Sequence, residues 1–198
     1  MFLNLGRRHI FERMACAGAK ANRWELRTGR LQEDKKQELE VSAQNIALPN
    51  LIIEDTPNLS VGEICSKSRA FAMETRLDFV IIDSPSVVNT EESILRLKEL
   101  ARSLDAAVIL TMSLPRTNWR TKDFRPQLHE FANTAAAEYA DVICFLHREG
   151  YYKRDDETLK DSATLIIAKN RDGYFGDIDL KFEADYALFS EREPEDIP

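Results

Sequence analysis

Three residues of this chain have the types and positions needed to act on a phosphate group. The apolar run FVII at 79–82 is followed by Asp83, and the run LIIA at 165–168 is followed by Lys169, with Arg171 two residues further on. A carboxylate at the carboxyl end of a buried parallel strand lies where open α/β sheets bind ligands, and it can hold magnesium through water. Two cations alternating along an extended segment can reach the terminal phosphate of a nucleotide. The pattern indicates part of a nucleotide site.

Each of these residues also has an ordinary structural interpretation. Asp83 could cap the helix or turn that follows its strand, and Lys169 and Arg171 could be two solvated charges beside a hairpin turn. The loop G-x-x-x-x-G-K-[ST], whose backbone would hold the phosphates, does not occur in the 198 residues. The residues by themselves therefore leave both interpretations open.

A basic segment at 113–125 has the composition of a single-stranded nucleic-acid contact. Its cations and the aromatic residues between them are Arg116, Trp119, Arg120, Lys122, Phe124 and Arg125. Such residues bind single strands through charge and base stacking, and a solvated mobile loop is the alternative. The formal net charge of −7 argues against binding by bulk electrostatics, so any such contact has to be local.

Composition places the chain among globular proteins of a reducing compartment. With 198 residues, 43% of them hydrophobic, it is long enough for one domain with a buried core. Cys16, Cys65 and Cys144 are odd in number and far apart, which fits neither a disulfide framework nor a zinc site. No run reaches the roughly 18 apolar residues of a membrane span, and the first residues do not have the order of a signal peptide. We therefore expect a cytoplasmic location and no membrane partner.

The elements that must position these residues alternate between helix and strand. Apolar periodicity predicts helices at 7–20, 33–46, 60–76, 90–104 and 127–139, and strands at 51–53, 79–83, 107–111 and 142–146, after the tail of a strand at 2–5. Ser60 and Glu63 have the spacing of a capping box. This alternation predicts an α/β fold whose mostly parallel sheet is flanked by helices and buried on both faces. The runs 165–168 and 178–182, across a turn with Gly173 and Gly176, predict a C-terminal β-hairpin.

Four segments, in this order, closely resemble the C-terminal motor domain of DnaB-type replicative DNA helicases. They are LRTGRL at 26–31, IEDTPNLSV at 53–61, VIID at 80–83 and AKNRDG at 168–173. Further matches occur at 125–126, 140–142 and 151–152 and in the hairpin after Gly176, so the resemblance runs from residue 2 to about residue 189. It implies an incomplete RecA-like P-loop-type domain over 1–189 that lacks the phosphate-loop strand, followed by an acidic tail at 190–198.

The resemblance also implies a function. Such domains assemble into a six-membered ring, bind ATP and magnesium between neighbours, and move along single-stranded DNA as they unwind it for replication. In this family Asp83 would organise magnesium through water, and Lys169 with Arg171 would reach into the neighbour's ATP site. The implied partners are intact helicase subunits or further copies of this chain, together with single-stranded DNA, which Arg116, Arg120, Lys122 and Arg125 would contact.

The chain departs from the family where hydrolysis needs specific residues. It starts after the point where the phosphate-loop strand and helix would lie, and Asn4 stands where the family has the glutamate that polarises water. Ser113 stands at an expected glutamine, and the loop after Asp83 lacks basic residues. The sequence thus favours a helicase-like domain that does not hydrolyse ATP alone. Two alternatives remain: a module that docks on an intact hexameric helicase as accessory or inhibitor, and a decayed gene fragment.

Overall fold

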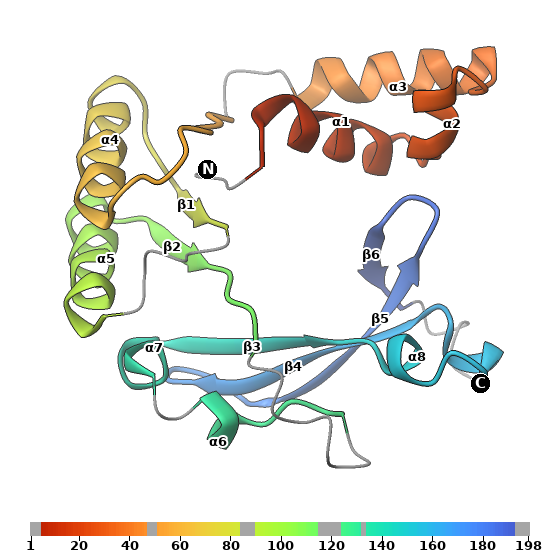
Figure 1. Ribbon diagram of the computed structural model, residues 1–198. Helices are drawn as coiled ribbons and strands as arrows, with labels where there is room; N and C mark the ends of the chain where they lie inside the picture. Colours follow the sequence, from red (N-terminus) through yellow and green to blue (C-terminus); the bar gives the residue numbers. More distant parts are fainter. Residues whose placement is uncertain (1–4, 47–50, 84–89, 115–123, 132–133, 193–198) are drawn as a thin grey trace. The chain divides into compact units, whose positions relative to one another are not determined.

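The chain is seen in a computed structural model that describes residues 5–46, 51–83, 90–114, 124–131 and 134–192 (Figure 1). Its contacts divide it into two compact units. The first comprises residues 1–10, 49–115 and 129–140, and the second comprises residues 11–48, 116–128 and 141–198. Asn4, Arg116, Arg120 and Lys122 lie outside the described residues, as does most of the expected strand at 2–5.

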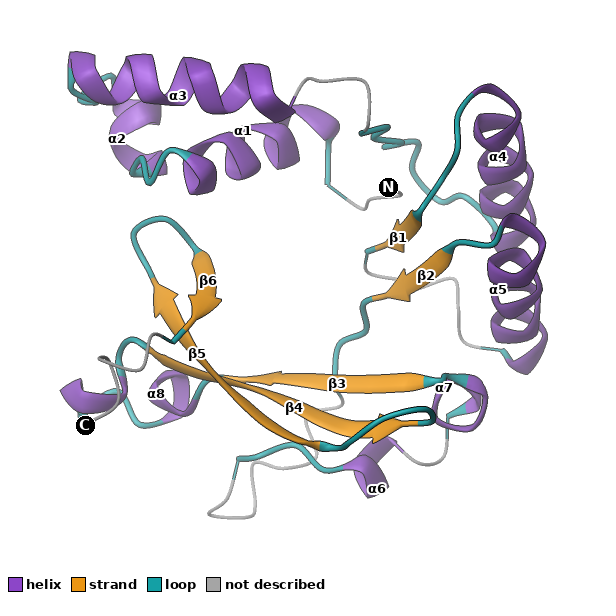
Figure 2. Ribbon diagram, turned by 180° about the vertical axis from the view of Figure 1, so that it is seen from behind, coloured by secondary structure: helices purple, strands orange, loops and turns teal. Residues whose placement is uncertain are grey.

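The first unit is built on two parallel strands with two helices along one side. Strand β1 (Phe79–Ile82) pairs with β2 (Ala107–Leu110), with Phe79 opposite Ala107. Helices α4 (Val61–Glu74) and α5 (Glu91–Leu104) lie beside each other on the same side of this pair in both views (Figures 1 and 2). The buried residues of the strands and helices include Val80, Ile82, Ile64, Leu97 and Leu100. The predicted strand–helix–strand order is confirmed here.

Local capping fixes where these helices begin. Ser60 precedes α4, and its hydroxyl accepts from the backbone N–H of Glu63 while the Glu63 carboxylate accepts from the backbone N–H of Ser60. The capping box expected from the sequence is thus present. Thr90 caps α5 through one bond, in which its hydroxyl accepts from the N–H of Ser93 at 3.2 Å. These bonds satisfy N–H groups that a helix start leaves open.

Among the described residues of this unit, none covers the other face of the parallel pair. Phe79 is 62% exposed and Ile109 is 43% exposed, so burial on both faces was a wrong expectation for these strands. The reason is that α4 and α5 cover a single face. The strand expected at 51–53 is also not formed: these residues are irregular, and Glu54 alone makes an isolated bridge.

A group of three helices opens the second unit. Helix α1 (Arg7–Gly18) begins in the first unit and ends in the second, followed by α2 (Arg23–Thr28) and α3 (Glu33–Ile46). The Ser42 hydroxyl of α3 donates to the carbonyl oxygen of Ala15 in α1 at 2.9 Å. A small apolar core lies at the ends of these helices, made by Ala19, Ala21 and Leu31 with Leu26 and Leu39 against it. The sequence predicted α1 and α3 but not α2.

The rest of the second unit is an antiparallel sheet of four strands in chain order. They are β3 (Val142–His147), β4 (Ser162–Asn170), β5 (Gly176–Glu183) and β6 (Leu188–Glu191). Leu165 of β4 faces Ile178 of β5, which confirms the predicted hairpin. Strand β3 pairs antiparallel with β4, whereas the sequence pattern placed it with the parallel strands. Strand β6 was not predicted, and it runs past the boundary expected at residue 189.

Short helices fill the connections. The single helix expected at 127–139 is described as α6 (Leu128–Phe131) and α7 (Ala135–Tyr139), with residues 132–133 outside the description. Helix α8 (Glu149–Tyr152) and a 3-10 turn (Glu157–Leu159) connect β3 to β4. Among the described segments, no helix combines the length and the apolar character of a membrane span.

Candidate functional site

Asp83 lies at the carboxyl end of the parallel pair and is held by a residue of the neighbouring strand end. The Thr111 hydroxyl donates to Asp83 Oδ1 at 2.6 Å, and the Thr111 backbone N–H donates to the carbonyl oxygen of Ile82 at 3.0 Å. Parallel register places the ends of β1 and β2 side by side, so residues 28 apart in sequence meet. The hydroxyl holds the carboxylate in a fixed orientation at the edge where α/β sheets bind ligands.

These residues fit one part of a magnesium–nucleotide site. Mg²⁺ binds at such sites through one or two carboxylates, water and substrate phosphates. Asp83 offers the carboxylate, with Thr111 orienting it. In the described ranges no group of three His, Cys, Asp or Glu residues could hold a metal on its own. The chain also contains no phosphate-loop sequence. Among the described residues, Asp83 and Thr111 thus account for one part of such a site.

The basic pair predicted from the sequence lies at the end of β4 in the second unit. Lys169 is the last residue but one of β4, opposite Ile143 of β3, and Arg171 follows the strand. Arg171 Nη1 forms an ion pair with Asp141 Oδ1 at 3.2 Å, and its backbone N–H donates to the Asp141 carbonyl oxygen at 2.9 Å. The Arg171 side chain is half exposed, so this ion pair is weak enough for another anion to displace Asp141 from the guanidinium.

The turn after the basic pair is ordered and carries two exposed aromatic residues. The Asn170 side-chain amide donates to the Tyr174 carbonyl oxygen at 3.1 Å, bridging the turn. A Cβ at Gly173 would lie 2.6 Å from that amide nitrogen, so a larger residue here would displace the Asn170 side chain from its bond across the turn. Tyr174 is 95% exposed and Phe175 is 77% exposed. We call residues 169–176 the finger hairpin.

Arg125, expected to contact nucleic acid, is paired within the second unit. Its Nη2 lies 2.5 Å from each carboxylate oxygen of Asp177, at the start of β5. The neighbouring Phe124 stacks face to face on Tyr152 of α8, with ring centroids 4.5 Å apart. These contacts tie the end of the basic segment to the sheet. Its other predicted contact residues lie in 115–123, outside the description, so a nucleic-acid role for Arg116, Arg120, Lys122 and Arg125 remains a prediction.

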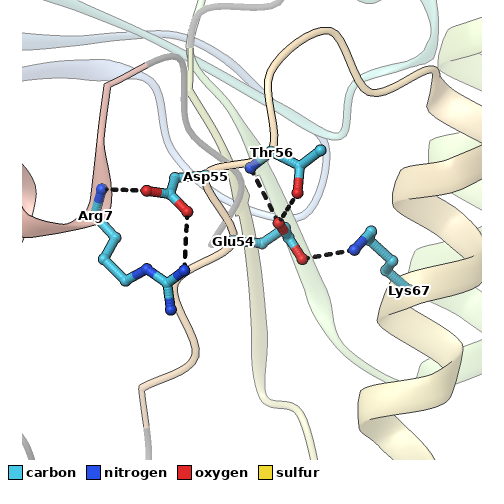
Figure 3. A network of polar contacts seen from close by, with 5 residues as sticks. All are labelled: Arg7, Glu54, Asp55, Thr56 and Lys67. Atoms are coloured by element: carbon cyan, nitrogen blue, oxygen red, sulfur yellow. Dashed lines mark hydrogen bonds and ion pairs between the residues drawn. The ribbon is translucent and has the colours of Figure 1, made fainter.

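A polar network in the first unit was missed by sequence reasoning, although its residues belong to a segment that resembles the family (Figure 3). Arg7 binds Asp55 twice, through its backbone N–H at 2.8 Å and its guanidinium at 3.4 Å. Glu54 accepts from Lys67 of α4 at 2.7 Å and from the backbone N–H of Thr56 at 3.0 Å. The partners are 48 and 13 residues apart, a spacing that no local pattern shows.

This network perturbs one carboxylic acid strongly. The Lys67 ammonium, followed by the hydroxyl and the N–H of Thr56, lowers the pKa of Glu54 from 4.5 to about 2. Hydrogen bonds to an ionised carboxylate favour its charged form, which explains the direction. Glu54 is thereby fixed as an anion that joins the irregular segment 51–60 to α4. Its role is to position the chain, and these partners do not include Asp83 or Thr111.

Comparison with known proteins identifies the family. The family model of the DnaB-like helicase C terminal domain matches residues 1–191. The replicative DNA helicases DnaB of Geobacillus stearothermophilus and DnaC of Bacillus subtilis are each 30% identical to this chain over 204 residues, which cover 96% of it. The chain spans 45% of the length of these relatives.

Solved structures agree with the sequence relatives. One solved ATPase domain superposes with a TM-score of 0.85 at 28% identity, covering 96% of this chain and 72% of that one. A DnaB-like replicative helicase, described with its interactions with primase, superposes with a TM-score of 0.87 at 28% identity, covering 97% of this chain and 51% of that one. The fold is therefore RecA-like, and the chain belongs to the family of the DnaB-like helicase C-terminal domain.

Proposed function

We propose that this chain is a motor-domain component of ATP-dependent DNA unwinding in replication, and that its 198 residues by themselves do not hydrolyse ATP. The observation that carries the proposal is the Asp83–Thr111 pair, which keeps a magnesium-organising carboxylate oriented in a sequence that has no phosphate loop. Asn4 instead of a glutamate supports it, because an amide does not accept a proton near neutral pH. The missing groups must come from outside these 198 residues.

The loss of transition-state stabilisation is large enough to account for the proposed inactivity of the isolated chain. Positioning of the reacting phosphate is worth about 7 kcal/mol or more in well-oriented systems. General-base help with the attacking water adds a factor of roughly 10² to 10⁴. Losing both slows turnover by many orders of magnitude, which no interaction of Asp83 alone offsets.

The direct test is phosphate release from ATP by the purified chain, with magnesium and a single-stranded oligonucleotide present. The matched control is Asp83→Ala, which removes the carboxylate at the strand end and leaves β1 otherwise unchanged. We expect the two proteins to release phosphate at the same background rate. Turnover that Asp83→Ala abolishes would show that the chain has an ATP site of its own.

A second function, docking on an intact helicase subunit, is favoured by the finger hairpin. An interface is energetically dominated by a few anchors, in which aromatic residues and arginine are enriched. Tyr174 and Phe175 are strongly exposed in the finger hairpin, which also contains Lys169 and Arg171. A finger of this kind acts on a neighbour's site and needs no ATP site on its own chain. The docked chain would be an accessory subunit or an inhibitor.

Docking is tested by mixing the chain with the intact replicative helicase encoded in the same genome. We expect the two to co-purify and the ATPase rate of the helicase to change. The paired substitution Tyr174→Ser with Phe175→Ser is expected to abolish co-purification, while Ile178→Ser, which alters a 42% exposed residue within β5, retains it. Absence of co-purification together with an unchanged ATPase rate would count against docking.

A further inference from the structure

Two neighbouring residues of the finger hairpin have the composition of a chemically reactive pair. Asp172 is the only aspartate of the chain that a glycine follows, and no asparagine precedes a glycine. Gly173 has no side chain that could shield its backbone nitrogen. An aspartate in this position can close on that nitrogen to form a succinimide ring. We call Asp172 and Gly173 the Asp-Gly pair.

The reacting groups of the Asp-Gly pair make no polar contact in the described part of the chain. Among these residues the Asp172 carboxyl group has no hydrogen-bond or ion-pair partner, and the Gly173 backbone N–H has no acceptor. Both residues are exposed, so water reaches the carboxyl group and the peptide bond between them. Neither the attacking nitrogen nor the carboxyl carbon therefore has to give up a contact before the ring closes.

The backbone next to the Asp-Gly pair is anchored, whereas the pair itself lies outside the strand ladder. Strand β4 ends at Asn170, β5 begins at Gly176, and residues 171–173 form bends. On the β4 side the Arg171 backbone N–H donates to the Asp141 carbonyl oxygen at 2.9 Å. The rotation that brings the carboxyl carbon to the backbone nitrogen therefore breaks no hydrogen bond between strands.

We propose that Asp172 is a modification site, which forms isoaspartate spontaneously and is then a substrate for enzymes that methylate isoaspartyl carboxyl groups. The Gly173 nitrogen attacks the carbon of the protonated Asp172 carboxyl group. A C–N bond forms, and the carboxyl hydroxyl leaves with the amide proton as water. Water then adds to one of the two ring carbonyl carbons and breaks its bond to the nitrogen. Opening at the main-chain carbonyl gives isoaspartate, and opening at the other carbonyl restores aspartate.

The modification changes the backbone of the finger hairpin without changing its charge. Isoaspartate keeps one carboxylate, but the main chain now runs through the former side chain and is one methylene longer. The bond from the Asn170 side-chain amide to the Tyr174 carbonyl oxygen spans the Asp-Gly pair, so the added length falls within the loop that this bond closes. The inference goes beyond the proposed function, because the reaction needs only the pair and water, whether or not the chain docks or meets ATP.

The test follows isoaspartate in the purified full chain during incubation in neutral buffer at physiological temperature. An enzyme that methylates isoaspartyl carboxyl groups, with radiolabelled S-adenosylmethionine as methyl donor, counts the modified residues. Cleavage after lysine releases the peptide 170–181, NRDGYFGDIDLK, in which fragmentation mass spectrometry locates the isoaspartate. We expect methyl acceptance to rise with time, isoaspartate to accumulate at residue 172, and a transient form of this peptide to be one water lighter.

One variant and one internal comparison test the assignment. Asp172→Glu keeps the charge but would have to close a larger ring, so we expect it to abolish the rise in methyl acceptance. Asp161 is the internal comparison, since it is also exposed and precedes a small residue, but Ser162 begins β4 and pairs with Lys181. We expect the peptide 161–169 to keep its starting content of isoaspartate.

The synthetic peptide NRDGYFGDIDLK gives the rate of the reaction without the fold. We expect the folded chain and this peptide to form isoaspartate at comparable rates, because the structure leaves both reacting groups free of contacts. A folded chain that forms no isoaspartate overturns the proposal, whatever the peptide does. So does isoaspartate that accumulates at Asp161 as fast as at Asp172, or methyl acceptance that survives Asp172→Glu. None of these results bears on whether the chain hydrolyses ATP, so the two proposals fail separately.

Discussion

Glu54 illustrates how a single side chain fixes an irregular segment. It forms a salt bridge with Lys67 of α4 at 2.7 Å, and this carboxylate is only 15% exposed (Figure 3). Some carboxyl groups have a pKa in the folded protein that is below its ordinary value. Such a group stabilises the fold at pH values above the ordinary pKa. That stabilisation is lost as the pH falls through the lower, folded-state pKa.

We predict that Glu54→Gln lowers the free energy of unfolding by about 1–2 kcal/mol at pH 7. The pKa of Glu54 falls from 4.5 to about 2 on folding. The difference in free energy of unfolding between Glu54→Gln and wild type should therefore have its full size above pH 4.5 and disappear towards pH 2. Urea unfolding at a series of pH values measures it. Glu92→Gln, which removes a 74% exposed partner of Arg96, is the control and should cause a small change. A pH-independent difference at Glu54 would refute the assignment.

The Asp83–Thr111 bond makes a prediction of its own. Thr111→Val keeps the shape of the side chain and removes the hydroxyl, so we expect a loss of about 0.5–1 kcal/mol in the free energy of unfolding. Thr111→Ser retains the donor and should keep most of the stability. Denaturant unfolding of the two variants side by side measures the difference. Equal stability of the Val and Ser variants would mean that the hydroxyl does not hold Asp83.

Among the elements, α8 depends on one glycine. A Cβ at Gly150 would lie 2.3 Å from the backbone carbonyl oxygen of Leu159, closer than any real contact. We predict that Gly150→Ala destabilises the fold by about 1–3 kcal/mol, as expected for overpacking against backbone. Gly62→Ala in α4 is the matched comparison, because its nearest neighbour would be 3.7 Å away and alanine favours helix. Gly62→Ala should raise the free energy of unfolding slightly, as measured by thermal or urea unfolding. Similar effects at both sites would contradict the packing described.

Elements with strong local signals were predictable from the sequence, and elements set by distant contacts were not. The predicted bounds of α3 match the structure and those of α5 differ by one residue, because periodicity and the Thr90 cap are local. Helix α2 is six residues long and β6 four, too short for periodicity to stand out. The antiparallel pairing of β3 depends on β4, twenty residues later, and a continuous apolar strand carries no sign of its direction.

The candidate site was predictable in its residue types more than in its contacts. Asp83, Lys169 and Arg171 could be named from strand ends and from the family resemblance. The hydroxyl of Thr111 on Asp83, the Asp141 partner of Arg171 and the Asp177 partner of Arg125 could not, since each joins segments between 28 and 52 residues apart. Such pairs become visible only when the register of the strands is known.

For the molecule as a whole, the exposed apolar face of the β1–β2 pair implies association. Phe79 and Ile109 leave an apolar surface that water solvates poorly, and such patches mark sites of protein contact. We predict that the chain self-associates as its concentration rises and that Phe79→Ser with Ile109→Thr shifts it towards monomer. Sedimentation velocity measures this, with Leu95→Ser, a 42% exposed residue of α5, as the control. A wild-type chain that stays monomeric at all concentrations would contradict the prediction.

At this scale we propose that the chain carries parts of an ATP site that work only together with another subunit. Its most direct test is the ATPase rate of an intact family helicase whose own basic finger has been removed, measured with and without this chain. We predict that the chain is inactive alone, that adding it restores hydrolysis by the fingerless helicase, and that Lys169→Ala with Arg171→Ala prevents the restoration. Hydrolysis by the chain alone, or a finger-deleted helicase that responds equally to the wild-type chain and the double variant, would show that the chain does not complete an ATP site of another subunit.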